Sequence, residues 1–274
     1  MKKLLIIVVL GLPYLGNAQD KWGQKFEQLE TILPTPNTYR TASGAPGRDY
    51  WQQKVDYVIE ASLNDNNQSI TGVETITYYN NSPDDLDYLW LQLDQNKRAS
   101  GSDADLTETR GMQEKVSGMG LQSITKEFDF EGGFNITSVT TAEGKALSKT
   151  INKTMMRVDL PASLKSGESF SFTVAWNFNI QDRMTLGGRS GYEYFPKDDN
   201  YLYAIAQWFP RMAPYDDLEG WQNKQFLGTG EFALEFGDYK VKLTVPEAFM
   251  VGATGWLQNS KEVLSAQEIE RFEL

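Results

Sequence analysis

Apolar and polar residues alternate through most of the chain after Tyr50, and this period of two constrains the fold more than any other feature. The pattern is clearest in FSFTVAWNFNI, residues 170–180, where Phe172 and Trp176 fall on the side opposite to Thr173 and Asn177. Successive side chains of a β-strand point to opposite faces, so this segment predicts a strand with one buried face. Similar patterns occur in residues 54–65, 67–82, 86–94, 121–130, 134–142, 145–151, 154–161, 230–236, 238–246 and 249–255.

About ten short strands with few helical patterns predict an all-β fold, either a β-sandwich or a curved, saddle-like sheet. The first two segments predict a β-hairpin, because the polar residues 64–67, NDNN, form a turn where they meet. Gly72 predicts a β-bulge in the second strand. We predict that one face of the hairpin is formed by Val55, Tyr57, Ile59 and Ser62 of the first strand against Ile70, Val73, Thr75 and Thr77 of the second. In residues 86–94, Leu89, Leu91 and Leu93 are predicted on one face of the strand, with Trp90 and Gln92 on the other.

The two ends of the chain differ from this pattern. Lys2 and Lys3 precede a short apolar run that closes with Gly16 and Ala18, which is typical of a signal peptide over residues 1–18. That run is too short for a membrane anchor, which needs ~20 apolar residues. We therefore expect an exported bacterial protein, periplasmic or extracellular, without a transmembrane anchor.

Two further segments follow the predicted signal peptide. Residues 19–49 predict a short amphipathic helix over 20–33 and a polar linker over 36–48, and residues 50–274 predict one β-sandwich domain. Residues 96–115 lack a period and predict a loop. Residues 260–274 predict part of a further strand that stops without a turn, so we expect the domain to be truncated at its C-terminus.

The composition excludes several classes of function. The 274 residues contain no His and no Cys, which removes the usual ligands of transition metals and the catalytic Ser-His-Asp and Cys-His arrangements. The formal net charge of −11 disfavours nucleic acid, whose phosphates would be repelled. Without Cys there is no disulfide framework, so the size of the core must stabilise the fold.

Three separated blocks of the sequence resemble one known family. Residues 50–96, residues 206–217 (AQWFPRMAPYDD) and residues 220–255 are similar, in this order, to the zinc aminopeptidases of the aminopeptidase N family, which is peptidase family M1 of the gluzincin type. Within this family, the sequence is most similar to the exported bacterial members. The resemblance implies the β-rich N-terminal domain of such an enzyme, which packs against a zinc-binding catalytic domain that removes N-terminal amino acids from peptides.

The motifs that hold zinc in this family, His-Glu-x-x-His and a downstream Glu, are absent from this sequence. The resemblance therefore implies that zinc belongs to a missing catalytic domain of the parent enzyme, and that this chain by itself holds neither metal ligands nor catalytic residues. The family's N-terminal domain also lends one Gln or Glu that binds the substrate's amino group. Gln207 is the nearest residue of this type, Glu193 is another option, and the familiar relatives carry it where this chain has Tyr201.

Residues 203–232, which we call the aromatic stretch, contain several large rings whose role we expect to be structural. Trp208, Phe209, Trp221 and Phe226 are expected to fill the seam between the sheet and a neighbouring domain. A Ca²⁺ site of Asp198, Asp199, Asp216, Asp217 and Glu219 does not follow the EF-hand spacing, and a solvated loop is favoured there. A glycosidase pair of Glu231 and Glu235 would stand ~13 Å apart on a strand, too far for either glycosidase mechanism.

Two functions remain open from the sequence. The first is the substrate-side domain of an exported zinc aminopeptidase, inactive as this fragment. The alternative is a non-catalytic, secreted β-sandwich that binds glycan or protein at the cell surface through exposed Trp and Tyr.

Overall fold

The computed structural model describes residues 36–107, 115, 117, 130–230 and 233–272. The predicted signal peptide, the predicted helix over 20–33 and most of the predicted strand over 121–130 lie outside the described residues. The contacts divide the chain into two units, Met1–Tyr50 and Trp51–Leu274. In the first unit the described residues form turns, in which Asn37 Oδ1 accepts hydrogen bonds from the backbone N–H groups of Tyr39 (2.8 Å) and Arg40 (2.9 Å).

The second unit is all-β, as the alternation predicts. Its strands are β1 (Lys54–Asn64), β2 (Ser69–Tyr79), β3 (Leu86–Gln92), β4 (Asn135–Thr141), β5 (Lys149–Asn152), β6 (Met155–Leu164), β7 (Ser169–Asn179), β8 (Gly191–Phe195), β9 (Asn200–Ala204), β10 (Arg211–Met212), β11 (Tyr215–Asp216), β12 (Gly220–Trp221) and β13 (Tyr239–Thr244). Its helices are short: η3 (Asp94–Arg98), α1 (Asp103–Thr107), α3 (Arg183–Leu186), α4 (Ser260–Val263) and α5 (Ala266–Phe272). No helix within the described ranges is long and apolar enough to span a membrane.

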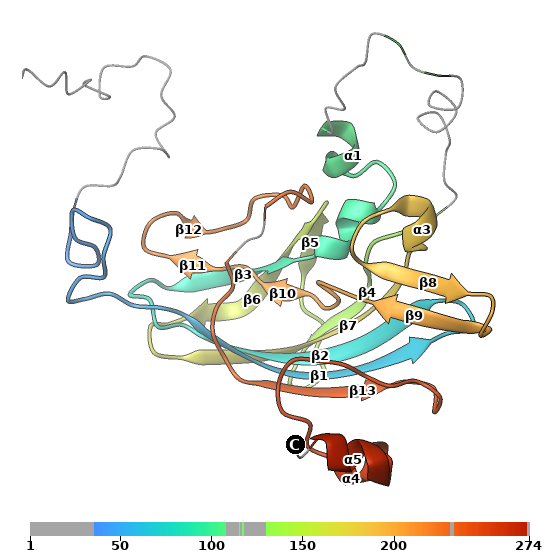
Figure 1. Ribbon diagram of the computed structural model, residues 1–274. Coiled ribbons are helices and arrows are strands. Elements are labelled where there is room, and N and C mark those ends of the chain that lie inside the picture. The colour runs from blue at the N-terminus through green and yellow to red at the C-terminus, as the bar shows by residue number, and fades with distance from the viewer. Residues whose placement is uncertain (1–35, 108–114, 116, 118–129, 231–232, 273–274) are drawn as a thin grey trace, which may run out of the picture. The chain divides into compact units, whose positions relative to one another are not determined.

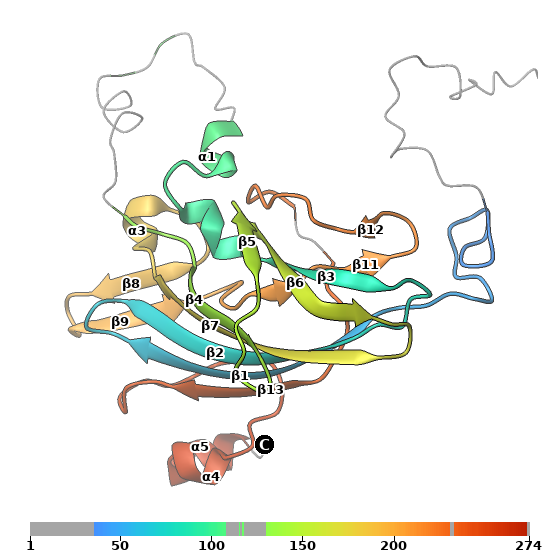
Figure 2. The ribbon, with the colours of Figure 1, turned by 180° about the vertical axis from the view of Figure 1, so that it is seen from behind.

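Two sheets enclose one hydrophobic core. The first has the strand order β13-β1-β2-β7-β4 and the second the order β10-β3-β6-β5. Figures 1 and 2 show β3 and β6 lying across one face of the β1-β2-β7 layer, with β13 at the edge of the larger sheet. Residues from both sheets, such as Ile59, Trp176, Leu89 and Val158, belong to the same buried cluster. The β8–β9 and β11–β12 hairpins complete the unit.

The predicted hairpin forms, but the predicted face of β2 is wrong. On β1, Val55, Tyr57 and Ile59 are buried as predicted, with Ala61 rather than Ser62 continuing the face. On β2 the buried residues are Ile70, Gly72, Glu74, Ile76 and Tyr78, whereas Val73, Thr75 and Thr77 point outward. The predicted residues switch from the inner face of the strand at Ile70 to its outer face at Val73, because a glycine and a carboxylate occupy inner positions of this strand.

Gly72 causes no bulge, because the pairing of β1 with β2 is regular throughout. It lies opposite Trp176 of β7, and a Cβ atom at Gly72 would stand 2.3 Å from Cζ2 of that indole. The glycine therefore provides the space in which the buried Trp176 ring packs, one of the meanings that glycine has within a strand.

Several other predicted elements need correction. Leu89, Leu91 and Leu93 are buried as predicted, but Gln92 is buried with them. The predicted loop after residue 96 contains part of η3 and α1. Residues 249–255 form no strand, and of residues 233–236 only Phe236 makes a bridge, to Lys54.

The described part of the C-terminal segment is helical, not the strand that we predict from sequence. Ser265 and Glu268 form a capping box at the start of α5: Glu268 Oε2 accepts from the backbone N–H of Ser265 at 2.7 Å, and Ser265 Oγ accepts from that of Glu268 at 3.3 Å. These hydrogen bonds from Ser265 lower the pKa of Glu268. The Ser-x-x-Glu spacing was the available signal for this helix.

Candidate functional site

Gln207 lies between β9 and β10 in a left-handed backbone conformation, with φ of 53°. The Gln95 amide fixes this bend, because its Nε2 donates to the carbonyl oxygens of Ala206 (2.8 Å) and Gln207 (3.0 Å). A left-handed conformation is uncommon for a residue other than glycine and often marks a functional position. The side chain of Gln207 is half-buried.

The other residues considered for the substrate's amino group lie in the β8–β9 hairpin. Glu193 pairs with Leu202 in the ladder, and its carboxylate stands 3.5 Å from Nη1 of Arg183. Tyr201 contacts the rings of Tyr192 and Tyr194. Each of these two side chains thus has its own partners within the hairpin or beside it.

The aromatic stretch packs on this chain's own core, so the expectation that it provides the surface for a neighbour needs correction. Trp208 contacts Trp176 with 6.0 Å between ring centroids, and Trp221 contacts Tyr78 at 5.8 Å. Phe209 packs edge-on against Tyr57 at 5.6 Å, and Phe226 is buried. The long irregular segment therefore closes one side of the sandwich, and the largest exposed apolar side chains lie elsewhere.

Arg211, which belongs to the sequence block QWFPRM, forms a buried ion pair with Asp94. Its Nε donates to Asp94 Oδ2 at 3.0 Å, its Nη2 donates to the same oxygen, and the Asp94 side chain is fully buried. Burial raises the pKa of Asp94, while the charge and hydrogen bonds of Arg211 oppose that rise. The pair connects β10 to the end of β3, where Arg211 is also paired with Gln92.

Glu74 is a second buried carboxyl group and has no such partner. It lies on the inner face of β2, is 0% exposed, and neither of its oxygens has a hydrogen-bond partner in the part of the chain that the structure describes. Burial raises the pKa of Glu74 well above its usual value. A buried carboxyl group of this kind is held in its neutral, protonated form.

The inner face of the larger sheet continues onto β13 but is not covered there. β13 pairs in parallel with β1, and Tyr239, Val241 and Leu243 stand beside the buried Tyr57, Ile59 and Ala61. Tyr239 stacks on Tyr57 with 4.8 Å between ring centroids. Yet Tyr239, Val241 and Leu243, which we call the β13 surface, are 48%, 43% and 37% exposed.

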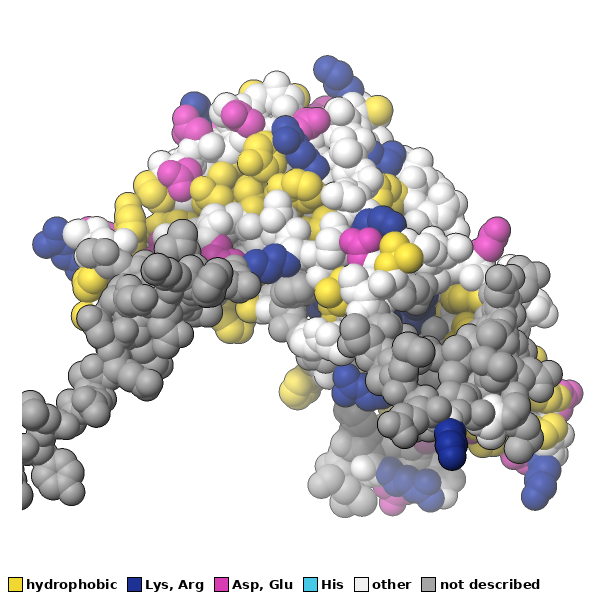
Figure 3. Space-filling view, turned by 90° about the horizontal axis from the view of Figure 1, so that it is seen from above, with side chains coloured by type: hydrophobic (Ala, Val, Ile, Leu, Met, Phe, Trp, Pro, Cys, Tyr) yellow, Lys and Arg dark blue, Asp and Glu magenta, His cyan; other side chains and the backbone are white. Residues whose placement is uncertain are grey.

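The segment that follows β13 adds further exposed apolar side chains. Trp256 is 85% exposed and Met250 is 73% exposed. Hydrophobic side chains also gather on another face, seen from above in Figure 3, where charged side chains border them. The β13 surface differs from such a patch, because it continues the core-facing side of the larger sheet beyond the part of that side that is buried.

Two of the acidic residues considered for a Ca²⁺ site, Asp199 and Asp216, accept local hydrogen bonds instead. Asp216 Oδ1 accepts from the backbone N–H groups of Leu218 (2.9 Å) and Glu219 (2.8 Å), and its Oδ2 accepts from Gln222 at 2.6 Å. Asp199 accepts a hydrogen bond from Tyr194 Oη at 2.7 Å. Among the residues that the structure describes, no group of three or more acidic side chains is arranged to hold a metal ion.

Glu235 is partly buried, and Glu231 lies outside the described residues. Burial is the main cause that raises the pKa of Glu235 to about 7, although its Oε1 accepts from the backbone N–H of Tyr215 at 3.1 Å. That hydrogen bond ties Glu235 to β11 and explains its position structurally.

Sequence reasoning missed the exposure of the β13 surface. The alternation of Tyr239, Val241 and Leu243 with two lysines does indicate one apolar face. Whether another layer covers that face depends on which strands the rest of the chain places over it, and local sequence carries no signal for this.

Comparisons with known proteins give similar structures but no sequence family. No protein-family model and no curated protein matches the sequence. Similar solved structures include the M1 zinc metallopeptidase from Deinococcus radiodurans (13% identity, TM-score 0.39, 77% of this chain and 36% of that one). A second is a mutant M1 zinc metallopeptidase from that organism bound to a Tyr-Ser-Ala substrate, with 13% identity and a TM-score of 0.39 over 78% of this chain and 38% of that one. A third is a mutant two-domain M1 zinc metallopeptidase bound to L-arginine, with 12% identity and a TM-score of 0.38 over 75% of this chain and 35% of that one. The chain thus spans less than two-fifths of the length of these structures.

Proposed function

We propose that this chain is the substrate-side β-domain of an exported zinc metallo-aminopeptidase, an enzyme that removes N-terminal amino acids from peptides. The observation that carries the proposal is the β13 surface, where the inner face of the larger sheet stands uncovered at Tyr239, Val241 and Leu243. β13 is an edge strand among the strands that the structure describes, and a core-type apolar face at such an edge is expected to pack against another domain. The resemblance of three sequence blocks to the aminopeptidase N family indicates which kind of domain this is.

In this proposal zinc belongs to the catalytic domain of the parent enzyme. A sequence without His or Cys offers none of the imidazole or thiolate ligands that zinc sites usually contain. The β-domain instead forms one wall of the substrate cleft and keeps bulk water from the peptide. Gln207 is the candidate acceptor for the peptide's free amino group, and the hydrogen bonds from Gln95 hold its backbone in position.

The test is an assay of the complete product of the gene that encodes this chain. We expect it to release N-terminal amino acids from tripeptides, to lose this activity on chelation and to regain it with Zn²⁺, whereas the 274-residue chain alone stays inactive. A Gln207→Ala variant should raise KM by about tenfold or more, the effect of losing a hydrogen bond to a charged group. A complete product that releases no amino acids, or releases them regardless of chelation, contradicts the proposal.

A further inference from the structure

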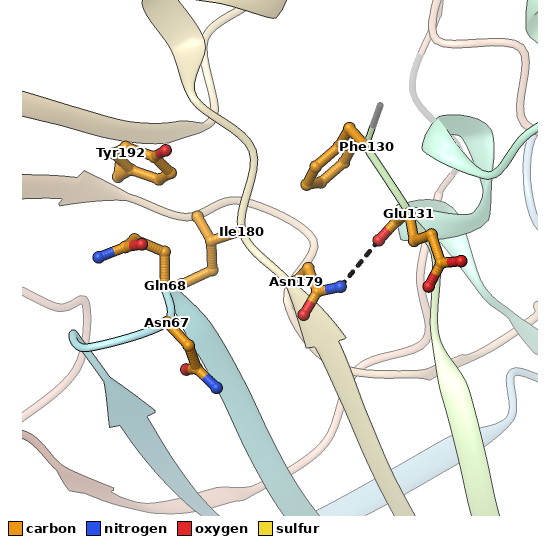
Figure 4. A pocket seen from close by; sticks show the side chains of 7 residues that line it. All are labelled: Asn67, Gln68, Phe130, Glu131, Asn179, Ile180 and Tyr192. Carbon is orange, nitrogen blue, oxygen red and sulfur yellow. Dashed lines mark hydrogen bonds between the residues drawn. The ribbon is translucent and has the colours of Figure 1, made fainter. Parts of the chain in front are cut away.

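A cavity outside the features described above lies at the end of the β1–β2 hairpin. Its volume is about 360 Å³, and it is a hollow open to solvent rather than an enclosed pocket. Figure 4 shows Tyr192 and Gln68 on one side, Asn179 and Glu131 on the other, and Ile180 between them. Three separate stretches of chain meet here: the turn before β2, the segment before β4, and the end of β7 with the start of β8.

The rim of this cavity is held in place by hydrogen bonds. Gln68 adopts a left-handed conformation with φ of 49°, its Nε2 donates to the carbonyl oxygen of Asp65 at 2.5 Å, and its own carbonyl accepts from the backbone N–H of Ile180 at 2.7 Å. Asn179 Nδ2 donates to the carbonyl oxygen of Glu131 at 3.0 Å. A ligand would therefore meet groups that are already oriented, which favours binding.

Each of the two asparagines at the rim has one polar amide atom that is available to a ligand. Asn67 Oδ1 accepts from Ser69 Oγ at 2.6 Å, which leaves its Nδ2 as a donor, and the bond that Asn179 donates leaves its Oδ1 as an acceptor. Neither atom has a hydrogen-bond partner within the described ranges. A donor and an acceptor on planar amides are suited to neighbouring hydroxyl groups of one ligand.

The aromatic side of the cavity extends into a row of rings. Tyr192 pairs with Tyr203, and Tyr194 pairs with Tyr201, so all four side chains lie on one face of the β8–β9 hairpin. The ring centroids of Tyr194 and Tyr201 are 4.9 Å apart, and those of Tyr192 and Tyr201 are 5.8 Å apart. Tyr194 is 44% exposed at the far end of the row. Such rings offer flat apolar faces with polar tips.

We propose that this cavity binds a neutral sugar unit of an oligosaccharide, with the Tyr192 ring against the apolar face of the sugar and the amides of Asn67 and Asn179 on its hydroxyl groups. Among the residues that the structure describes, no Lys or Arg lines this cavity and Glu131 does, which disfavours an anionic ligand. This proposal does not rest on the proposed peptidase function.

The test measures binding of trisaccharides to the full chain by calorimetry or NMR titration. We expect at least one of cellotriose, maltotriose and the N-acetylglucosamine trimer to bind with Kd of ~10 mM or tighter. Combining Asn67→Ala with Asn179→Ala should weaken binding about tenfold or more, because two hydrogen bonds are lost. Both side chains are exposed, so the variant should fold normally. The matched control is Asn66→Ala, in the same turn but outside the lining, which should bind like the wild type.

Three results would overturn the proposal. The first is that none of the three neutral trisaccharides binds. The second is that trigalacturonic acid or tri-alanine binds at least as tightly, which would identify an anion or peptide site instead. The third is that Asn66→Ala weakens binding as much as the double variant does, which would place the ligand elsewhere on the turn.

Discussion

The Arg211→Met variant is expected to lower the free energy of unfolding by about 3–5 kcal/mol, the usual effect of removing one partner from a buried ion pair. Asp94 would keep a fully buried carboxylate without the guanidinium that now donates to its Oδ2. Burial already raises the pKa of Asp94, and loss of Arg211 removes the main opposing influence, so the side chain would be forced toward its neutral form. Urea unfolding at neutral pH measures the loss.

Two further variants separate this effect from a general loss of an arginine. Arg157→Met removes a half-exposed pair, in which Arg157 Nε stands 2.8 Å from Asp159 Oδ1, and should change stability by less than about 1 kcal/mol. Combining Arg211→Met with Asp94→Leu should recover much of the loss, because no unpaired charge then remains buried. Equal losses in the two single variants would show that the Arg211–Asp94 pair is not the buried connection between β10 and β3.

The Glu74→Leu variant should have the opposite sign and raise stability at pH 7 by roughly 1–3 kcal/mol, because it removes a buried polar group without a hydrogen-bond partner. The gain should depend on pH. In the unfolded chain the carboxyl group ionises above its ordinary pKa of 4.5, whereas the folded chain keeps the proton because burial raises the pKa of Glu74 well above that value. The wild type therefore loses stability as pH rises above about 4.5 toward the folded-state pKa.

Unfolding of Glu74→Leu and wild type at pH 4 and pH 7 measures this dependence. The advantage of the variant should be larger at pH 7. Glu74→Gln is the matched control, since it removes the ionisation but keeps a polar side chain, so it should lose the pH dependence while gaining less stability. A Glu74→Leu variant that is less stable than wild type at both pH values would mean that the carboxyl group has a partner in the folded protein.

The fold was predictable from sequence where local alternation and packing agree. In β7 every second residue from Phe172 to Phe178 is buried, so the prediction of this strand and its face is confirmed. In β2, Gly72 and Glu74 occupy inner positions for reasons that only the fold supplies: one makes room for the Trp176 indole, and the other is enclosed as a neutral acid. With these two positions occupied by a glycine and an acid, the pattern placed Val73 and the threonines on the inner face, which was wrong.

The functional features were less predictable, because they depend on contacts between distant segments. The role of Arg211 requires that β10 lie beside β3, and the rim at Asn67 and Asn179 requires that the β1–β2 turn reach the end of β7. The sequence pattern showed Asn67 only as part of a turn. Gln207 was selected from the resemblance, and the structure adds that its backbone is bent and held by Gln95.

The most direct measurement of the central claim, that another domain covers the β13 surface in the parent protein, is the rate of thiol labelling at Val241→Cys. The present chain has no cysteine, so this variant carries a single reactive thiol in it. Lys242→Cys, on the opposite face of β13 where the Lys242 side chain is 72% exposed, is the control. We expect fast labelling of both variants in this chain alone. In the complete gene product, labelling of Val241→Cys should be at least ~10-fold slower while Lys242→Cys stays fast, because a packed domain excludes the reagent from one face of β13. Equally fast labelling of Val241→Cys in the chain and in the complete product would show that no domain covers the β13 surface.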